Sequence, residues 1–244
     1  MTREPDVLTL GGGPVSRRAV RAVVGAAVVA VLALAGYAGW QHFRPVPDFT
    51  LEQLQGAYAG MVRSDGTNAV STIDPGRFTD PPLAIDPPAC APLFATVSNQ
   101  LLSPALDGVS TSWLAGDDSV SLFTVRYADR TAAEAAYRTV WDAVSSCEAQ
   151  TVHVSGREGS ARLVRIPVPA GEPAPEQLAF GLDRIGGQGR YVLHLLRLRN
   201  TVSWQYRYDA RTCQYDPTSA QQMMTALATQ LLSVQQQDEL KAGG

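Results

Sequence analysis

Cysteine, histidine and lysine are scarce in this sequence, and their scarcity excludes several kinds of chemistry. The 244 residues include three cysteines, three histidines and a single lysine, Lys241. His42, His153 and His194 each stand alone, and neither a CxxC nor an HExxH pattern occurs, so we expect no metal site and no cofactor. The nucleophile motifs GxSxG and SxxK are absent, as are the protein-kinase signatures. We therefore assign no catalytic residue.

Charge is also sparse and unevenly distributed. Charged residues make up 18% of the chain and the net charge is −3 at pH 7, which argues against a nucleic-acid partner. Hydrophobic residues make up 45%, as expected of a chain that folds. Four arginines lie within residues 1–21, and no charged residue then follows until Arg44. The uncharged stretch between them is a candidate membrane segment.

This stretch, from residue 22 to residue 40, reads AVVGAAVVAVLALAGYAGW. As a helix it would span about 28 Å, close to the thickness of a hydrocarbon core. We predict a transmembrane signal anchor over residues 22–42 and a short cytoplasmic tail over residues 1–21, because arginines favour the cytoplasmic side. Two alternatives stay open: a signal peptide cleaved at Ala33-Leu34-Ala35, and a buried helix of a soluble domain.

The next segment, residues 43–88, is predicted to hold a juxtamembrane helix and a Pro-rich loop. Thr50 and Gln53 form the pattern of a capping box, after which apolar residues recur at helical spacing. Residues 63–88 are rich in Pro, Asp, Gly, Ser and Thr, and are expected to form a long loop.

The rest of the chain shows strand and helix patterns in succession. A short helix at ACAPLFATVSNQL precedes a strand over 119–127 and a helix that Thr131 caps and Cys147 ends. Strands follow at TVHVS, ARLVRIPV and LAFGLDR, and then a long hairpin that turns near residues 199–201. A closing amphipathic helix begins after Asp216 and reaches residue 235, and residues 236–244 form a polar tail. This order predicts an α+β fold with a largely antiparallel sheet packed with helices.

Aromatic residues on the second arm of the hairpin form the most suggestive surface. Trp204, Tyr206 and Tyr208 alternate with polar residues, so they share one face of a strand. Together with Arg197 and Arg207 they are a candidate ligand cleft, in which the rings would suit an apolar or sugar-like ligand and the arginines an anionic one. The alternatives are core packing for the rings and solvated strand edges for the arginines.

An acidic pair, Asp117-Asp118, is a second candidate. Two adjacent carboxylates can bind a cation or act in acid–base chemistry. A solvated turn before the strand explains the pair more simply.

The cysteines matter most if the domain lies outside the membrane, where the environment is oxidising. Cys90, Cys147 and Cys213 allow three different single disulfides. Cys90 and Cys147 both lie on apolar faces of predicted helices, which suits a bond inside the core. Such a bond would close a long loop and stabilise the fold by about 4 kcal/mol.

Three segments carry a resemblance to a known family: DPPACAPLF, SVSLFTVRYADRTAAEAAYRTVWDAVSSCEAQTVHV and RNTVSWQYRYDARTCQYD, followed by the closing helix. Their order resembles the PknH-type extracellular sensor domain of actinobacteria, here over residues 89–235 and without a kinase domain. The family occurs fused to receptor kinases and also alone, as anchored envelope proteins. The resemblance implies an α+β domain with an antiparallel sheet and a ligand-sized cleft, and no established catalytic residues.

The resemblance also implies a pairing of the cysteines. Cys90 and Cys147 match the first disulfide of the family, and Cys213 matches its fourth cysteine. The third cysteine would fall near Val192, where this sequence has no thiol. Cys213 is therefore expected to be a free thiol.

The function expected from these observations is that of a single-pass, extracytoplasmic sensor-like or ligand-binding domain of the cell envelope, without enzymatic activity. Its expected partners are the membrane, a small ligand or envelope component, and a membrane protein that passes the signal on, because residues 1–21 are too few for a kinase. One alternative is an envelope hydrolase that uses scattered carboxylates or Cys213. Another is a structural envelope protein with no small ligand.

Overall fold

The computed structural model of the chain describes residues 47–61, 69–77, 84–95, 104–115, 118–154, 160–168, 176–185, 190–209 and 217–242. The predicted cytoplasmic tail, the predicted anchor over 22–42 and Cys213 lie outside these ranges. In the part that is described, no helix is both long and apolar enough to cross a membrane. Residues 48–244 form one compact unit.

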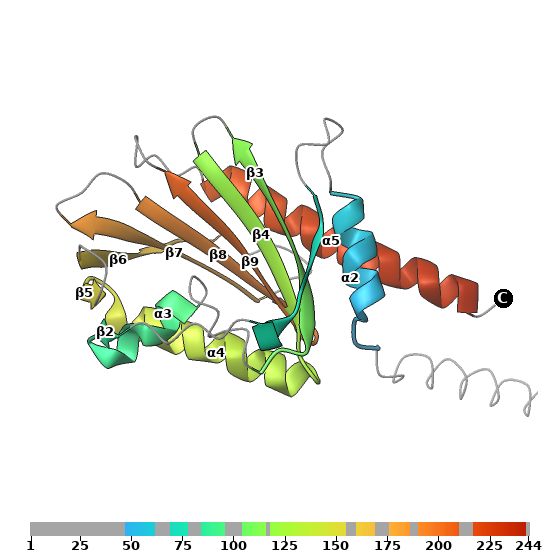
Figure 1. The fold of residues 1–244 in the computed structure, drawn as a ribbon, viewed down its shortest axis with the longest axis horizontal. Coiled ribbons are helices and arrows are strands. Elements are labelled where there is room, and N and C mark those ends of the chain that lie inside the picture. The colour runs from blue at the N-terminus through green and yellow to red at the C-terminus, as the bar shows by residue number, and fades with distance from the viewer. Residues whose placement is uncertain are drawn as a thin grey trace, which may run out of the picture. The chain divides into compact units, whose positions relative to one another are not determined.

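The centre of this unit is a nine-stranded sheet in which every neighbouring pair of strands is antiparallel (Figure 1). Its order is β1-β3-β4-β9-β8-β7-β6-β5-β2. The predicted α+β class with an antiparallel sheet is confirmed. The strands are β1 (Ser71–Ile73), β2 (Ile85–Asp86), β3 (Asp107–Ala115), β4 (Asp118–Arg126), β5 (Thr151–Val154), β6 (Ser160–Ile166), β7 (Glu176–Ile185), β8 (Arg190–Leu198) and β9 (Thr201–Asp209).

The connections explain this order. Helix α4 (Arg130–Cys147) carries the chain across the sheet from β4 to β5, and the five strands β5 to β9 then return side by side until β9 lies next to β4. The last turn of this meander, at Arg199 and Asn200, confirms the predicted hairpin; Arg199 has a left-handed backbone with φ 55°. The two edge strands, β1 and β2, both come from the segment predicted as a loop over 63–88, which was therefore wrong in part. They are only three and two residues long, a common way to limit edge-to-edge pairing.

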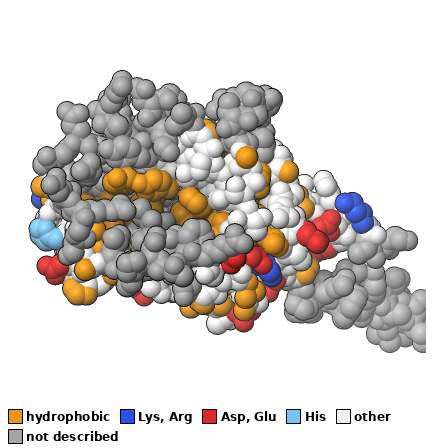
Figure 2. Space-filling view, in the orientation of Figure 1, with side chains coloured by type: hydrophobic (Ala, Val, Ile, Leu, Met, Phe, Trp, Pro, Cys, Tyr) orange, Lys and Arg blue, Asp and Glu red, His pale blue; other side chains and the backbone are white. Residues whose placement is uncertain are grey.

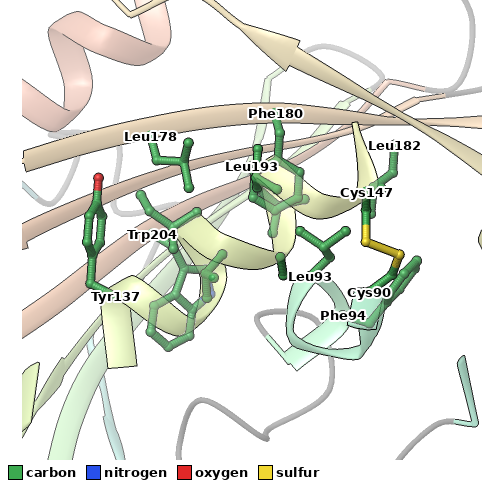
Figure 3. Packing of buried hydrophobic residues seen from close by; sticks show 14 of the residues in the cluster. Cys90, Leu93, Phe94, Tyr137, Cys147, Leu178, Phe180, Leu182, Leu193 and Trp204 are labelled. Carbon is green, nitrogen blue, oxygen red and sulfur yellow. A yellow bond between two sulfur atoms is a disulfide. The ribbon is translucent and has the colours of Figure 1, made fainter. Parts of the chain in front are cut away.

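One face of the sheet, here called the α4 face, packs against α4, the short 3₁₀ helix η2 (Pro88–Cys90) and α3 (Ala91–Ala95). Leu195 lies directly opposite Trp204 in the β8–β9 register, and Phe123 lies opposite Trp204 in the β4–β9 register, so the three side chains share this face. Figure 3 shows the resulting apolar cluster, with Tyr137 and Trp204 toward one end and the disulfide at the other. Residues from β6 to β8 complete it: Leu163, Leu178, Phe180, Leu182 and Leu193.

The opposite face, here called the α5 face, is covered by α2 (Leu51–Ala59) and α5 (Pro217–Ala242). Its apolar contacts are supplemented by buried hydrogen bonds. The Tyr58 hydroxyl lies 2.8 Å from Oγ1 of Thr124, which in turn lies 2.7 Å from Oγ of Ser203. All three side chains are buried, so each hydroxyl depends on its neighbours for a partner.

A second buried group ties the start of this compact unit to the sheet. The side-chain amide of Asn200 accepts a hydrogen bond from the backbone N–H of Phe49 at 2.8 Å and donates to the Phe49 carbonyl at 3.2 Å. It also approaches the Tyr127 carbonyl at 3.4 Å. Arg199 lies over the Phe49 ring at 4.9 Å. The turn between β8 and β9 therefore holds the backbone at Phe49, near the start of the compact unit.

Strand β3 was missed in the sequence, which gives no predicted element over residues 107–115. The alternation of Val109, Thr111 and Trp113 with serines was the available signal, but a threonine at the centre of that face weakens the apolar side of the pattern. Gly108 is needed at this position: a Cβ there would lie 2.4 Å from the carbonyl oxygen of Thr124 on β4. β3 therefore approaches β4 too closely for a side chain at this point.

The starts of α2 and α5 and the end of α4 at Cys147 agree with the predictions, and the start of α4 does not. The capping box of Thr50 and Gln53 is present, and Pro217 opens α5. The N-cap of α4 is Asp129, whose carboxylate accepts from the N–H of Ala132, so the prediction of Thr131 was wrong. Helix α4 begins at Arg130, soon after the end of β4. The short side chain of Asp129, and not that of Thr131, is therefore placed to accept from the free N–H groups of the first turn.

The closing helix is also longer than predicted. Residues 236–242, predicted to belong to a polar tail, continue α5 to Ala242. Gln235 is buried, and Asp238 accepts a hydrogen bond from Gln53 on α2 at 3.2 Å. These contacts with α2 stabilise the added turns, and they make α2 part of the same unit as the sheet rather than of a separate juxtamembrane segment.

Candidate functional site

A disulfide between Cys90 and Cys147 fixes the end of α4. The two Cα atoms lie 5.8 Å apart, and both side chains are fully buried. This is the pairing that the resemblance implied. Val192, where that resemblance places a missing cysteine, is buried on β8 opposite Arg207. The link joins η2 to α4 and so holds the α4 face closed at that end (Figure 3).

The residues of the predicted ligand cleft are divided between the core and the surface. Trp204 is buried on the α4 face, 5.3 Å from the Phe123 ring and stacked on it, which is the core-packing alternative. Tyr206 is half-buried and stacks on Tyr191 at 5.4 Å. Tyr208 belongs to β9, and its side chain is outside the described set. Two rings thus share the predicted face, one of them inside the core.

The two arginines of the predicted cleft lie on different faces of the sheet. Arg197 is opposite Glu176 on the α4 face and donates to its carboxylate at 2.6 Å. This hydrogen bond lowers the pKa of Glu176 and raises the pKa of Arg197, which keeps both groups charged. Arg207 is opposite Val192, on the α5 face. The structure therefore brings Arg197, but not Arg207, to the side of Trp204 and Tyr206.

Next to this ion pair, α4 and β7 enclose a small pocket of about 230 Å³, here called the Tyr137 pocket. Its lining residues are Tyr137, Arg138, Trp141, Glu176 and Gln177. The Tyr137 hydroxyl is buried and has no hydrogen-bond partner, and burial, with a smaller effect of Glu176, raises its pKa above the usual range. The phenol is therefore neutral.

A larger pocket of about 440 Å³ lies where α4 meets β6 and β7, and is here called the Arg165 pocket. It shares Trp141 and Gln177 with the Tyr137 pocket, so the two adjoin. The Arg165 guanidinium lies 4.7 Å from the centre of the Trp141 ring. The full lining is Trp141, Glu148, Arg165, Ile166, Pro167, Val168, Gln177, Leu178 and Ala179. Figure 2 shows that hydrophobic side chains gather in a band across the middle of the view, above α4.

The two described histidines line neither pocket. His153 pairs with the Ser160 hydroxyl, and His194 is buried with Nε2 2.9 Å from Gln177, where burial lowers its pKa to about 4. Within the described ranges no group of acidic, His or Cys side chains could hold a metal ion. Asp118 pairs with Ala115 where β3 turns into β4, and Asp117 is outside the described set.

Sequence reasoning missed the residues that line the two pockets. Trp141 lies on α4 four residues after Tyr137, beside the apolar stripe and not within it, and Arg165 lies on the only partly alternating strand β6. A half-buried tryptophan on a helix flank was the available signal. The sequence does not reveal that β6 ends and β7 begins beside this tryptophan.

Comparison with solved structures gives a likeness of fold. The extracellular domain of PknH from Mycobacterium tuberculosis matches with a TM-score of 0.52 and 14% identity, over 78% of this chain and 99% of that domain. The Rv0999 ortholog from Mycobacterium smegmatis, an uncharacterized protein, gives a TM-score of 0.42 and 10% identity, over 76% and 98%. A scan against known protein families and a search of curated proteins find no match. The predicted likeness to a PknH-type sensor domain is confirmed at the level of the fold.

Proposed function

We propose that the chain is a membrane-anchored, extracytoplasmic ligand-binding domain of the sensor type, without enzymatic activity of its own. The observation that carries this proposal is the likeness of fold to the extracellular domain of PknH, which extends over 99% of that domain. The domain would act by binding a small ligand or envelope component, or through a membrane protein partner.

Two features of the chain support this location. The disulfide between Cys90 and Cys147 suits an oxidising compartment. The uncharged segment 22–42, preceded by arginines, suits one membrane crossing with the N-terminus in the cytoplasm.

The surface of the domain supports a binding role. Two adjoining pockets open beside α4, and the larger has the volume of a small-molecule site. Glu176 of the smaller pocket is held by an ion pair and Arg165 of the larger one lies over a ring, and among the described residues no Ser, Thr, Cys or His side chain lines either pocket. Such a surface can bind and orient a molecule without reacting with it.

A pair of reporter fusions tests the location. Alkaline phosphatase, which is active only outside the cytoplasm, is fused after Gly244, and a fluorescent protein that folds only in the cytoplasm is fused at the same point in a second strain. We expect phosphatase activity and no fluorescence. The matched control lacks residues 22–42 and should reverse both signals. Fluorescence without phosphatase activity in the full chain would refute the proposal.

A further inference from the structure

The two adjoining pockets differ in how their charges are matched. In the Tyr137 pocket, Glu176 is paired with Arg197 at 2.6 Å, and Arg138 with Glu134 at 3.3 Å. In the Arg165 pocket, the described part of the chain supplies no ion-pair partner for either Arg165 or Glu148. The larger pocket therefore contains one positive and one negative group that are both available to a ligand.

The positions of these two groups are set by the backbone. Glu148 is the C-cap of α4 and directly follows Cys147, which the disulfide holds. The N–H of the next residue, Ala149, donates to the carbonyl of Leu163 on β6 at 3.2 Å. Arg165 follows two residues later on the same strand, so its side chain shares the face of the buried Leu163. The fold thus holds both charges along one wall of the pocket.

Each charge is presented in a way that selects its ligand group. The guanidinium carbon of Arg165 lies 4.7 Å from the centre of the Trp141 ring, and a guanidinium group can donate two parallel hydrogen bonds to a carboxylate. Glu148 lies at the C-terminal end of an 18-residue helix, where the partial negative charge of the helix adds to that of the carboxylate. A ligand ammonium group is favoured there.

Between and beneath the charges the pocket is apolar. Leu178 and Ala179 are buried, and Ile166 and Val168 are half-buried. The volume of about 440 Å³ lies within the range of small-molecule sites. From Trp141 to Glu148 the axis of α4 rises by about 10 Å, and a dipeptide of roughly 7 Å between its ends fits within that length.

Building on the proposed ligand-binding function, we propose that the Arg165 pocket binds a small zwitterion, namely a short peptide with both termini free. Its carboxylate contacts Arg165, its ammonium group contacts Glu148, and an apolar side chain packs on the side of Leu178, which shares the α4 face with Arg165. The charges of the ligand pair with two groups for which the described residues supply no ion-pair partner, so both termini are required.

The probe is glycyl-leucine, titrated calorimetrically into the full chain in detergent, beside N-acetyl-glycyl-leucine and glycyl-leucine amide. Each capped peptide lacks one charged terminus. We expect binding of the free dipeptide and at least about tenfold weaker binding of each capped form, because each loses one charge-assisted contact.

Variants assign each terminus to its residue. In Arg165→Gln, the free dipeptide and its amide should bind equally weakly, because the contact to the carboxylate is already lost. In Glu148→Gln, the free dipeptide and its acetylated form should bind equally weakly, because the contact to the ammonium group is already lost. Arg162→Gln is the matched control: Arg162 is exposed on the same strand but on the other face and lines neither pocket. It should bind the dipeptide as the unaltered chain does. Urea unfolding of each variant confirms that it is folded.

Four outcomes overturn the inference: no binding of the dipeptide, equal binding of all three peptides, unchanged binding in Arg165→Gln, or loss of binding in Arg162→Gln. If binding is absent while the phosphatase fusion places the domain outside, this inference fails and the proposed location stands. If the fusions place the domain in the cytoplasm but it binds the dipeptide, the proposed location fails and this inference stands.

Discussion

The two faces of the sheet are closed by different interactions. The α4 face is closed by aliphatic and aromatic side chains and one disulfide, and where β6 ends and β7 begins it leaves two pockets. The α5 face is closed by two helices over a layer that includes buried hydroxyls and the Asn200 amide. Buried polar groups must keep their partners, so that face tolerates little rearrangement. The difference suggests that stability and binding can be altered separately.

The largest effect is expected from the disulfide on the α4 face. Replacing Cys90 and Cys147 by alanine should lower the free energy of unfolding by about 4 kcal/mol, because the bond restricts the unfolded chain over a sequence separation of 57 residues. Urea unfolding of the oxidised chain measures the loss. Cys213→Ala is the control and should behave like the unaltered chain. A loss below about 1 kcal/mol in the double variant would show that the α4 face is held by its rings alone.

A somewhat smaller loss is expected on the α5 face. Asn200→Ala leaves the Phe49 N–H and carbonyl without their buried partner and should cost about 3 kcal/mol in unfolding free energy. Gln150→Ala, which removes an exposed amide that contacts the Ser146 carbonyl, should cost less than about 0.5 kcal/mol. Equal losses in the two variants would contradict the role assigned to the Asn200 turn.

The pH dependence of stability should report on His194. Its pKa falls from 6.5 in the unfolded chain to about 4 in the folded one, because burial disfavours the charged ring. Between these values the unfolded state binds more protons, so stability is fully present above pH 6.5 and decreases as the pH falls toward 4. From pH 7.5 to pH 5 the loss from this residue should be about 2 kcal/mol.

The measurement is the urea midpoint at several pH values, for the unaltered chain and for His194→Gln. The variant should show a shallower decrease over this range. His153→Gln is the control, since His153 is exposed on β5. If His194→Gln and the unaltered chain decrease in parallel, the buried histidine is not the group that titrates.

The smallest stability effect should come from the pocket. Arg165→Gln removes an exposed guanidinium that has no ion-pair partner among the described residues, so the unfolding free energy should change by less than about 0.5 kcal/mol. Thermal or urea unfolding tests this directly. A loss above about 1 kcal/mol would mean that the cation over Trp141 is a structural contact, and the separation of the two faces would be less complete.

The comparison also shows how far the sequence could be read. Strand β4, helix α4 and the hairpin of β8 and β9 follow from local periodicity, and the resemblance indicated the pairing of Cys90 with Cys147. Strand β3 was missed because serines and threonines interrupt its apolar alternation, and β1 and β2 because strands this short depend on neighbours distant in sequence.

The predicted cleft and the two pockets involve the same face of the sheet but different rings. Alternation placed Trp204 and Tyr206 together, yet it cannot show which part of a face a helix covers, and α4 covers Trp204. Trp141 and Arg165 come together only because α4 crosses the sheet and the Ala149–Leu163 hydrogen bond fixes its end against β6. Trp141 and Arg165 are far apart in the sequence, so their contact cannot be inferred from local patterns.

Hydrogen exchange of the full chain, measured by mass spectrometry with and without glycyl-leucine, tests the central claim that the ligand binds on the α4 face and that the α5 face takes no part in binding. The account predicts slower exchange in the C-terminal half of α4 and in β6 and β7, with α2 and α5 unchanged. Slower exchange in α2 or α5, or no change anywhere at saturating dipeptide, would contradict it.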